Sequence, residues 1–211
     1  MLAVVALSHL LASCAPTIAP RTMAAVVRVE SGGDPLALHD NTSGRSFAPG
    51  DAREAAAWTT ELLALGHSLV LGLSQINTAN LPRLGLSVAA AFEPCANLRA
   101  GATVLSGDYR AASARFGAGQ FALRSALGAY NSGSLYAGRA YVDRILAAAG
   151  LPPENVATRP VVDAAPPLIA HVATWPRRRT VSSMTRIAAP AASFAVVHTP
   201  GSPVEILVGT P

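Results

Sequence analysis

The chain of 211 residues is poor in charged and aromatic side chains and contains no lysine. Charged residues make up 13% of it, aromatic residues make up 5%, and all sixteen basic residues are arginine. The formal net charge is +4, and the arginines are scattered apart from the run Arg177-Arg178-Arg179, which has no interleaved aromatic residues. This distribution argues against nucleic-acid binding and predicts that the arginine run is a solvated segment.

Several motifs of common enzyme classes are also missing. The histidines have no metal-ligand spacing; they are His9, His39, His67, His171 and His198. There is also no glycine-rich loop of the kind that binds phosphate. Ser31 has no nucleophile-elbow context and no matching histidine and acid, which argues against acyl transfer. We therefore expect neither a metal nor a cofactor.

No hydrophobic run is long enough to span a bilayer, and the apolar residues 1–13 lack a basic segment typical of a signal peptide. Leu11-Ala12-Ser13-Cys14 resembles a lipoprotein processing box, which would make Cys14 a lipid-modified first residue. Alternatively, these residues form the first helix of the domain.

Cys95 is the second of only two cysteines, and two cysteines in an exported protein most simply pair. We expect a Cys14–Cys95 disulfide, which would contribute about 4 kcal/mol to stability.

The periodicity of apolar residues predicts a mainly α fold with a small β element, an α+β class. Turn-forming residues at 34–50 predict a hairpin or a long ordered loop, and Asp51 and Glu54 have the spacing of a capping box. The predicted helices cover residues 20–31, 51–66, 95–109, 119–130 and 139–149. Prolines recur and periodicity fades after residue 153. The chain thus divides into an N-terminal apolar segment (1–13), a domain (14–150) and a proline- and alanine-rich linker with a largely disordered tail (151–211).

Glu30 is the most informative residue because it is a carboxylate on the apolar face of a short helix. Met23, Val26, Val27 and Glu30 stand at helical offsets 0, 3, 4 and 7, so the acid points toward the core. Burial and the negative end of the helix dipole both disfavour the charged form, which predicts a raised pKa. A carboxyl group that stays protonated near neutral pH suits a general acid. The alternative is a glutamate that bends outward at a fraying helix end.

Two further segments carry polar side chains of interest. Gly72-Leu-Ser-Gln-Ile-Asn77 offers two amides, which suit sugar hydroxyls and N-acetyl groups, although on its own it also fits a polar helix start. Ala129-Tyr-Asn131 places Tyr130 at the end of an apolar helix face, where a tyrosine is usually a packed core residue.

In this order, Glu30-Ser31, Gly72–Asn77 and Ala129-Tyr-Asn131 resemble the three-part signature of lytic transglycosylases with a goose-type-lysozyme-like (SLT) domain. Three segments resemble the branch of this family that serves type IV secretion and conjugation: Cys14-Ala-Pro, Glu-Ser-Gly-Gly-Asp-Pro-Leu-Ala and Phe92-Glu-Pro-Cys-Ala-Asn-Leu98. The resemblance covers residues 10 to 150. Ser74 stands where relatives often have methionine, and Val70 where an acidic residue is common; we expect neither change to remove the chemistry.

The resemblance implies a lysozyme-like domain that cleaves the β-1,4 bond between N-acetylmuramic acid and N-acetylglucosamine and forms a 1,6-anhydro ring. Glu30 would be acid and then base, supported by Ser31, Tyr130 and Asn131. Gly72, Gln75, Ile76 and Asn77 would bind substrate. No second acid is matched by the motif, and the substrate's N-acetyl group would take its place. Asp34, Asp40 and Glu54 remain candidates for a second acid.

We therefore interpret the chain as a periplasmic, monomeric cell-wall enzyme, associated with the inner or outer membrane, that opens peptidoglycan for a secretion apparatus. Its tail would contact other components of that apparatus. The alternatives are a glycan-binding or assembly protein without turnover and a lysozyme-like hydrolase that delivers water.

Overall fold

The computed structural model describes residues 4–152, and the predicted tail lies outside this range from residue 153 onward. The described residues are mainly helical with one small antiparallel sheet, as predicted. The elements are α1 (Val4–Cys14), α2 (Pro20–Ser31), β1 (Leu38–Asp40), β2 (Arg45–Phe47), α3 (Ala52–Ala64), β3 (Leu69–Leu71), β4 (Ile76–Asn77), the 3₁₀ turn η1 (Thr78–Asn80), α4 (Leu81–Leu84), the 3₁₀ turn η2 (Ala90–Phe92), α5 (Pro94–Phe116), α6 (Gln120–Ser132) and α7 (Arg139–Ala148).

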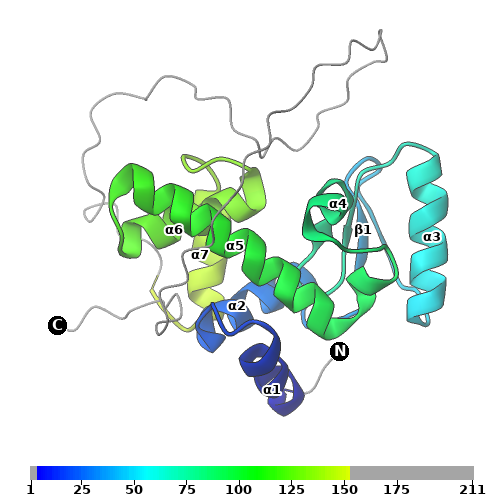
Figure 1. Ribbon diagram of the computed structural model, residues 1–211, viewed down its shortest axis with the longest axis horizontal. Helices are drawn as coiled ribbons and strands as arrows, with labels where there is room; N and C mark the ends of the chain where they lie inside the picture. The colour runs from blue at the N-terminus through cyan, green and yellow to red at the C-terminus, as the bar shows by residue number, and fades with distance from the viewer. Residues whose placement is uncertain (1–3, 153–211) are drawn as a thin grey trace, which may run out of the picture.

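Helix α5 crosses the middle of the molecule, with the sheet and α3 toward one end and α6 and α7 toward the other (Figure 1). It packs against α6 and α1, while α2 packs against α1 and α7. Two apolar clusters result. One joins the helices and contains Met23, Val26 and Val27; the other fills the space around the sheet and contains Leu71 and Phe92. The end of α2 is thereby brought beside the sheet.

The sheet has the strand order β2-β1-β3-β4, with Leu38 opposite Phe47 on one side and Leu71 on the other. Strands β1 and β2 form the small hairpin that turn residues predicted. Strands β3 and β4 were not predicted. The segment from Gly72 to Asn77 is a turn followed by β4, and only its last residue starts a helical element, because Asn77 caps η1. Positive φ angles at Gly72 (70°) and Gln75 (47°) are incompatible with a helix there.

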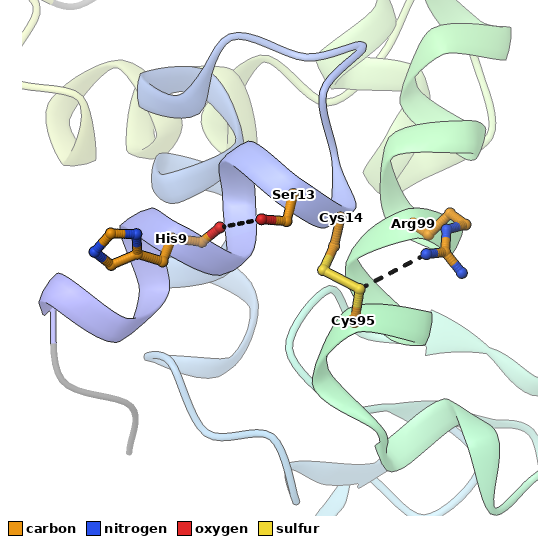
Figure 2. The surroundings of a disulfide bond; sticks show 5 residues. All are labelled: His9, Ser13, Cys14, Cys95 and Arg99. Carbon is orange, nitrogen blue, oxygen red and sulfur yellow. Dashed lines mark hydrogen bonds between the residues drawn. A yellow bond between two sulfur atoms is a disulfide. The ribbon is translucent and has the colours of Figure 1, made fainter.

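Residues 4–14 form the first helix of the domain, and the predicted disulfide is present (Figure 2). Cys14 at the end of α1 is bonded to Cys95 in the first turn of α5, across 81 residues of sequence. The bridge uses Sγ of Cys14, the atom to which a lipid would be attached, so the structure favours the helix over the lipoprotein interpretation. Within residues 4–152, none of the helices combines the length and apolar character needed to cross a bilayer.

Candidate active site

A cleft of about 1030 Å³ lies between the end of α2 and the sheet. Five of the side chains to which the three motifs assign a role line it: Glu30, Ser31, Gln75, Tyr130 and Asn131. They come from α2, from the turn after β3 and from the end of α6, which are separated by up to about a hundred residues of sequence. The fold therefore brings the three motifs together around one space.

Glu30 turns into this cleft because the rest of its helix face is packed. Met23, Val26 and Val27 are fully buried, and Glu30 follows them on the same stripe. Helix α2 starts at Pro20, which suits a first helical position, and ends at Gly32 with φ 63°. The carboxyl group therefore stands at the last turn of α2, half-buried and facing the sheet.

The pKa of Glu30 is raised, as the sequence predicted, and burial is the main cause. Two groups from α7 act in the opposite direction. The Tyr141 hydroxyl donates a hydrogen bond to Oε1 of Glu30 at 2.5 Å, and the positive charge of Arg144 lies nearby. Arg144 also lies over the Tyr141 ring, 5.6 Å from its centroid. Burial thus favours the protonated acid, while Tyr141 and Arg144 stabilise the carboxylate that forms when the proton is lost.

Ser31 connects the end of α2 to the turn after β3. Its Oγ lies 2.8 Å from the carbonyl oxygen of Leu73 and 3.1 Å from that of Val27, and it accepts a hydrogen bond from the backbone N–H of Gly33. These contacts fix the position of the helix end, and therefore of Glu30, relative to the sheet.

Asn97 of α5 fixes the turn after β3 by hydrogen bonds, and its side chain is buried, with 1% exposed. Asn97 Nδ2 donates to the carbonyls of Leu71 (2.9 Å) and Ala91 (2.7 Å), and Oδ1 accepts from the backbone N–H of Ser74 (2.7 Å). Gly72 packs so closely on Asn97 that a Cβ atom would collide with its amide and lie 2.6 Å from the Ala91 oxygen. Gly72 is thus buried, and it shapes the turn through its backbone.

Gln75 is the one non-glycine residue with a positive φ in the described chain, at 47°. Such backbone strain is often found at functional sites. Its Nε2 donates to the carbonyls of Ala37 (3.2 Å) and Gly72 (2.9 Å), which uses both amide hydrogens. Oε1 is the acceptor that remains for a ligand in the cleft.

Tyr130 and Asn131 close the cleft from α6. Tyr130 is 7% exposed, and its hydroxyl donates to the Ser74 carbonyl at 2.7 Å. Burial raises the pKa of Tyr130 well above its usual value, and the nearby charge of Glu30 adds to this, so the hydroxyl stays protonated. Asn131 is exposed at the cleft edge.

Ile76 and Asn77 are both buried in β4, at 3% and 1% exposure. Asn77 uses its side chain within the protein. Its Oδ1 accepts from the backbone N–H of Ala79 at 2.8 Å, and its Nδ2 donates to Ser68 Oγ at 3.3 Å. Neither residue is among those that line the cleft.

The three carboxylates considered as second acids all serve local structure. Asp34 accepts from the backbone N–H of Leu36 at 3.0 Å, and Glu54 accepts from that of Gly50 at 2.6 Å. Asp40 is fully buried and paired with His67. Of the three, only Asp34 lines the cleft.

The structure adds one carboxyl group that sequence analysis did not single out. Burial raises the pKa of Asp108, on α5, to about 7, although the charge of Arg83 opposes the shift. Asp108 is not among the residues that line the cleft.

Tyr141, Arg144 and Asn97 were also missed as site residues. Tyr141 lies on the apolar face of its helix and is 2% exposed, as an ordinary core residue would be. Its hydroxyl, however, reaches Glu30 across 111 residues of sequence. The only available signal was a tyrosine and an arginine three residues apart on α7. Among residues 4–152, no group of three or more His, Cys, Asp or Glu side chains is placed to hold a metal ion.

Comparison with known proteins identifies relatives along most of the chain. The pattern of the Transglycosylase SLT domain matches residues 10–142. The type IV secretion system protein virB1 of Brucella suis biovar 1 (strain 1330) is 36% identical over 174 residues, which cover 79% of this chain and 73% of that protein. Protein virB1 of Rhizobium radiobacter is 41% identical over 143 residues, covering 67% and 59%. No solved structure matches the chain.

Proposed function

Because the chain belongs to the Transglycosylase SLT family, it is a lytic transglycosylase, and we propose that Glu30 alone serves as its acid and base. The substrate is peptidoglycan, cleaved at the β-1,4 bond between N-acetylmuramic acid and N-acetylglucosamine. The observation that carries the proposal is the half-buried Glu30, whose pKa is raised by burial. Tyr141 donates a hydrogen bond to Glu30, and the positive charge of Arg144 lies nearby, so both stabilise the carboxylate form.

In the first step, protonated Glu30 gives its proton to the glycosidic oxygen, and the bond from that oxygen to C1 of the muramic acid breaks. The N-acetyl carbonyl of the same sugar stabilises the positive charge that develops at C1. Glu30 is then a carboxylate. The Tyr141 hydrogen bond and the Arg144 charge stabilise it in this state, because both lower its pKa.

In the second step, the Glu30 carboxylate takes the proton of the muramic acid 6-hydroxyl, whose oxygen forms a bond to C1. This closes the 1,6-anhydro ring and returns Glu30 to its protonated form. No water is consumed. One group with a raised pKa and a stabilised anion is sufficient for both transfers, so a second carboxylate is not required.

The remaining cleft residues receive supporting roles in this proposal. Ser31 fixes the end of α2, Gln75 Oε1 and Asn131 bind sugar substituents, and Tyr130 holds the turn at Ser74. Gly72, Ile76 and Asn77 support the substrate site by shaping the turn and β4.

The names of the relatives assign them to type IV secretion. We extend this to the present chain: it acts on the cell wall, in the periplasm, and opens peptidoglycan locally for a type IV secretion apparatus. We further propose that it works as a monomer, that it associates with a membrane, and that residues 151–211 contact the apparatus.

The proposal is tested by Glu30→Gln, which keeps the shape of the side chain and removes the transferable proton. We expect muropeptide release from purified peptidoglycan to fall by about 10²- to 10⁴-fold. Since burial penalises the charge of Glu30, Glu30→Gln should be at least as stable as the native protein in a neutral-pH melt. Asp108→Asn is the matched control, because it also removes a buried carboxyl group with a raised pKa. Activity retained by Glu30→Gln, or lost equally by Asp108→Asn, contradicts the proposal.

A further inference from the structure

The wall of the cleft opposite α2 contains an Asp–His pair that the proposed chemistry does not use. His67 Nδ1 lies 2.7 Å from Oδ2 of Asp40, and His67 lines the same cleft as Glu30. We propose that His67, oriented by Asp40, forms a second sugar-binding site, which contacts the glycan strand at a ring other than those joined by the scissile bond. This inference rests on the proposed function for the identity of the ligand as a glycan.

The pair is a built feature of the fold. Asp40 is fully buried at the end of β1, and its oxygens accept hydrogen bonds from the Ser43 hydroxyl at 2.5 Å and from the backbone N–H of Thr42 at 2.8 Å. Burial by itself would raise the pKa of Asp40, but the hydrogen bonds from Ser43, His67 and Thr42 outweigh it and lower the pKa to about 2. Asp40 is therefore a carboxylate at any pH at which the enzyme works.

A buried carboxylate fixes which imidazole nitrogen carries a proton. Nδ1 of His67 must donate to Asp40, so Nε2, on the far side of the ring, is the atom left to meet a ligand. The side chain of His67 is 26% exposed, which leaves that edge accessible. In the neutral ring, Nε2 accepts a hydrogen bond from an N–H or O–H group of the ligand.

The backbone around His67 is fixed as well. Asn41 donates its backbone N–H to the Ser68 carbonyl at 2.8 Å, and the backbone N–H of Ser68 donates to Thr42 Oγ1 at 2.9 Å. His67 itself lies in the connection between α3 and β3, and these hydrogen bonds tie that connection to the turn after β1.

His67 and the turn that carries Gln75 lie at opposite ends of β3. His67 precedes β3, and the far end of β3 leads into Gly72 and the turn with Gln75. Five residues of extended chain span about 16 Å, so the imidazole and Gln75 contact different parts of a bound strand.

The surrounding wall has the composition of a sugar site. Its polar side chains are neutral hydrogen-bonding groups, among them Asn41, Ser46 and Ser68, and Phe47 and Leu65 add apolar surface. The one arginine that lines the described cleft is Arg144, beside Glu30. Neutral donors and acceptors next to apolar surface suit a sugar ring with hydroxyl and acetamido groups. Arg45 lies beside this wall, 5.5 Å from the centroid of the Phe47 ring, so a peptide carboxylate is the competing ligand that the test must distinguish.

The test measures binding of N-acetylglucosamine oligomers to the Glu30→Gln protein, in which turnover is blocked. We expect calorimetry to show that His67→Ala weakens binding of a long oligomer by about three- to tenfold and leaves a disaccharide unaffected. His9→Ala, which changes an exposed histidine of α1, should change neither. In the active enzyme, His67→Ala should raise KM for long strands without changing kcat, because the contact is the same in ground and transition states.

His67→Ala leaves Asp40 without its partner and could misfold. A second measurement therefore keeps His67 in place. Nitrogen NMR of the imidazoles in the Glu30→Gln protein should show a shift of His67 Nε2 when the long oligomer binds, with no shift for His9. The inference is overturned if Nε2 does not shift, if the disaccharide and the long oligomer lose affinity equally, or if free stem peptide produces the shift instead. These results do not depend on turnover, so a failed chemical mechanism with intact binding at His67 would be recognised as such.

Discussion

At the scale of single residues, Glu30 is subject to opposing influences that match the two proton transfers we propose for it. Burial raises its pKa and favours the protonated acid, while the Tyr141 hydroxyl and the Arg144 charge favour the carboxylate. An acid that was only buried would be a poor base after its proton had left. The α7 side chains therefore matter mainly for the second half of the reaction.

Tyr141→Phe tests this division of labour. The hydrogen bond from Tyr141 lowers the pKa of Glu30, so its removal should raise that pKa further. The activity of a general acid falls as pH rises through its pKa; the alkaline limb of the pH–rate profile should therefore move to higher pH. We expect kcat to fall by about 10- to 100-fold, since one stabilising hydrogen bond to a charged group is lost.

Tyr136→Phe is the control for Tyr141→Phe, because the hydroxyl of Tyr136 contacts Arg115 at the surface. It should leave both the rate and the pH profile unchanged. A downward shift of the alkaline limb in Tyr141→Phe, or no shift at all, would show that Tyr141 does not stabilise the carboxylate.

The half-buried position and raised pKa of Glu30 could be predicted from the sequence, and its contact with Tyr141 could not, for a physical reason. A carboxylate on an apolar helical stripe is conspicuous within eleven residues of local sequence. Tyr141 instead looks like an ordinary packed residue, and its role arises from a contact that spans 111 residues. The same holds for Asn97, whose three hydrogen bonds depend on the placement of β3 over α5.

At the scale of elements, the cleft depends on how closely the turn after β3 approaches α5. Gly101 of α5 lies directly beneath Ser74: a Cβ added there would stand 2.6 Å from Ser74 Oγ and 2.9 Å from Met23 Cε. Ser74 in turn accepts the hydrogen bond from Tyr130. The small residue on α5 thus allows the turn, Tyr130 and α2 to meet.

Gly101→Ala should therefore destabilise the protein by about 1–3 kcal/mol through overpacking and should also lower activity by displacing the Ser74 turn. Gly107→Ala, on the same helix with open space around the added Cβ, should stabilise it by about 0.5–1 kcal/mol. Urea unfolding of both variants measures the difference. Equal effects of the two substitutions would rule out the close approach.

The major helices and the hairpin could be predicted because their signals are local: Asp51 accepts from the backbone N–H of Glu54 as the capping pattern indicated, and the turn residues of 41–44 close β1 on β2. Strands β3 and β4 could not. They have three and two residues, too few to show an alternating pattern, and they exist because long-range pairing with β1 stabilises them.

At the scale of the whole molecule, α5 is the element on which the two apolar clusters and the N-terminal helix converge. The disulfide attaches α1 to the first turn of this helix (Figure 2). The bridge closes a loop of 81 residues that contains α2, the sheet and most of the cleft. It therefore restricts the unfolded chain over the region that builds the active site.

Removal of the bridge should lower the free energy of unfolding by about 4 kcal/mol in the chain-entropy account. The measurement is urea unfolding with and without a reducing agent. The double variant Cys14→Ser, Cys95→Ser should match the reduced native protein and should not respond to the reducing agent. If reduction leaves the unfolding midpoint unchanged, the bridge does not contribute to stability.

The central claim, that Glu30 transfers both protons without water, is tested most directly by digesting purified peptidoglycan in oxygen-18 water and analysing the products by mass spectrometry. We expect 1,6-anhydromuramic acid ends that carry no heavy oxygen. We also expect that Glu30→Gln yields almost no product. Reducing ends that carry one heavy oxygen would contradict the central claim, because they would show that the enzyme delivers water to C1.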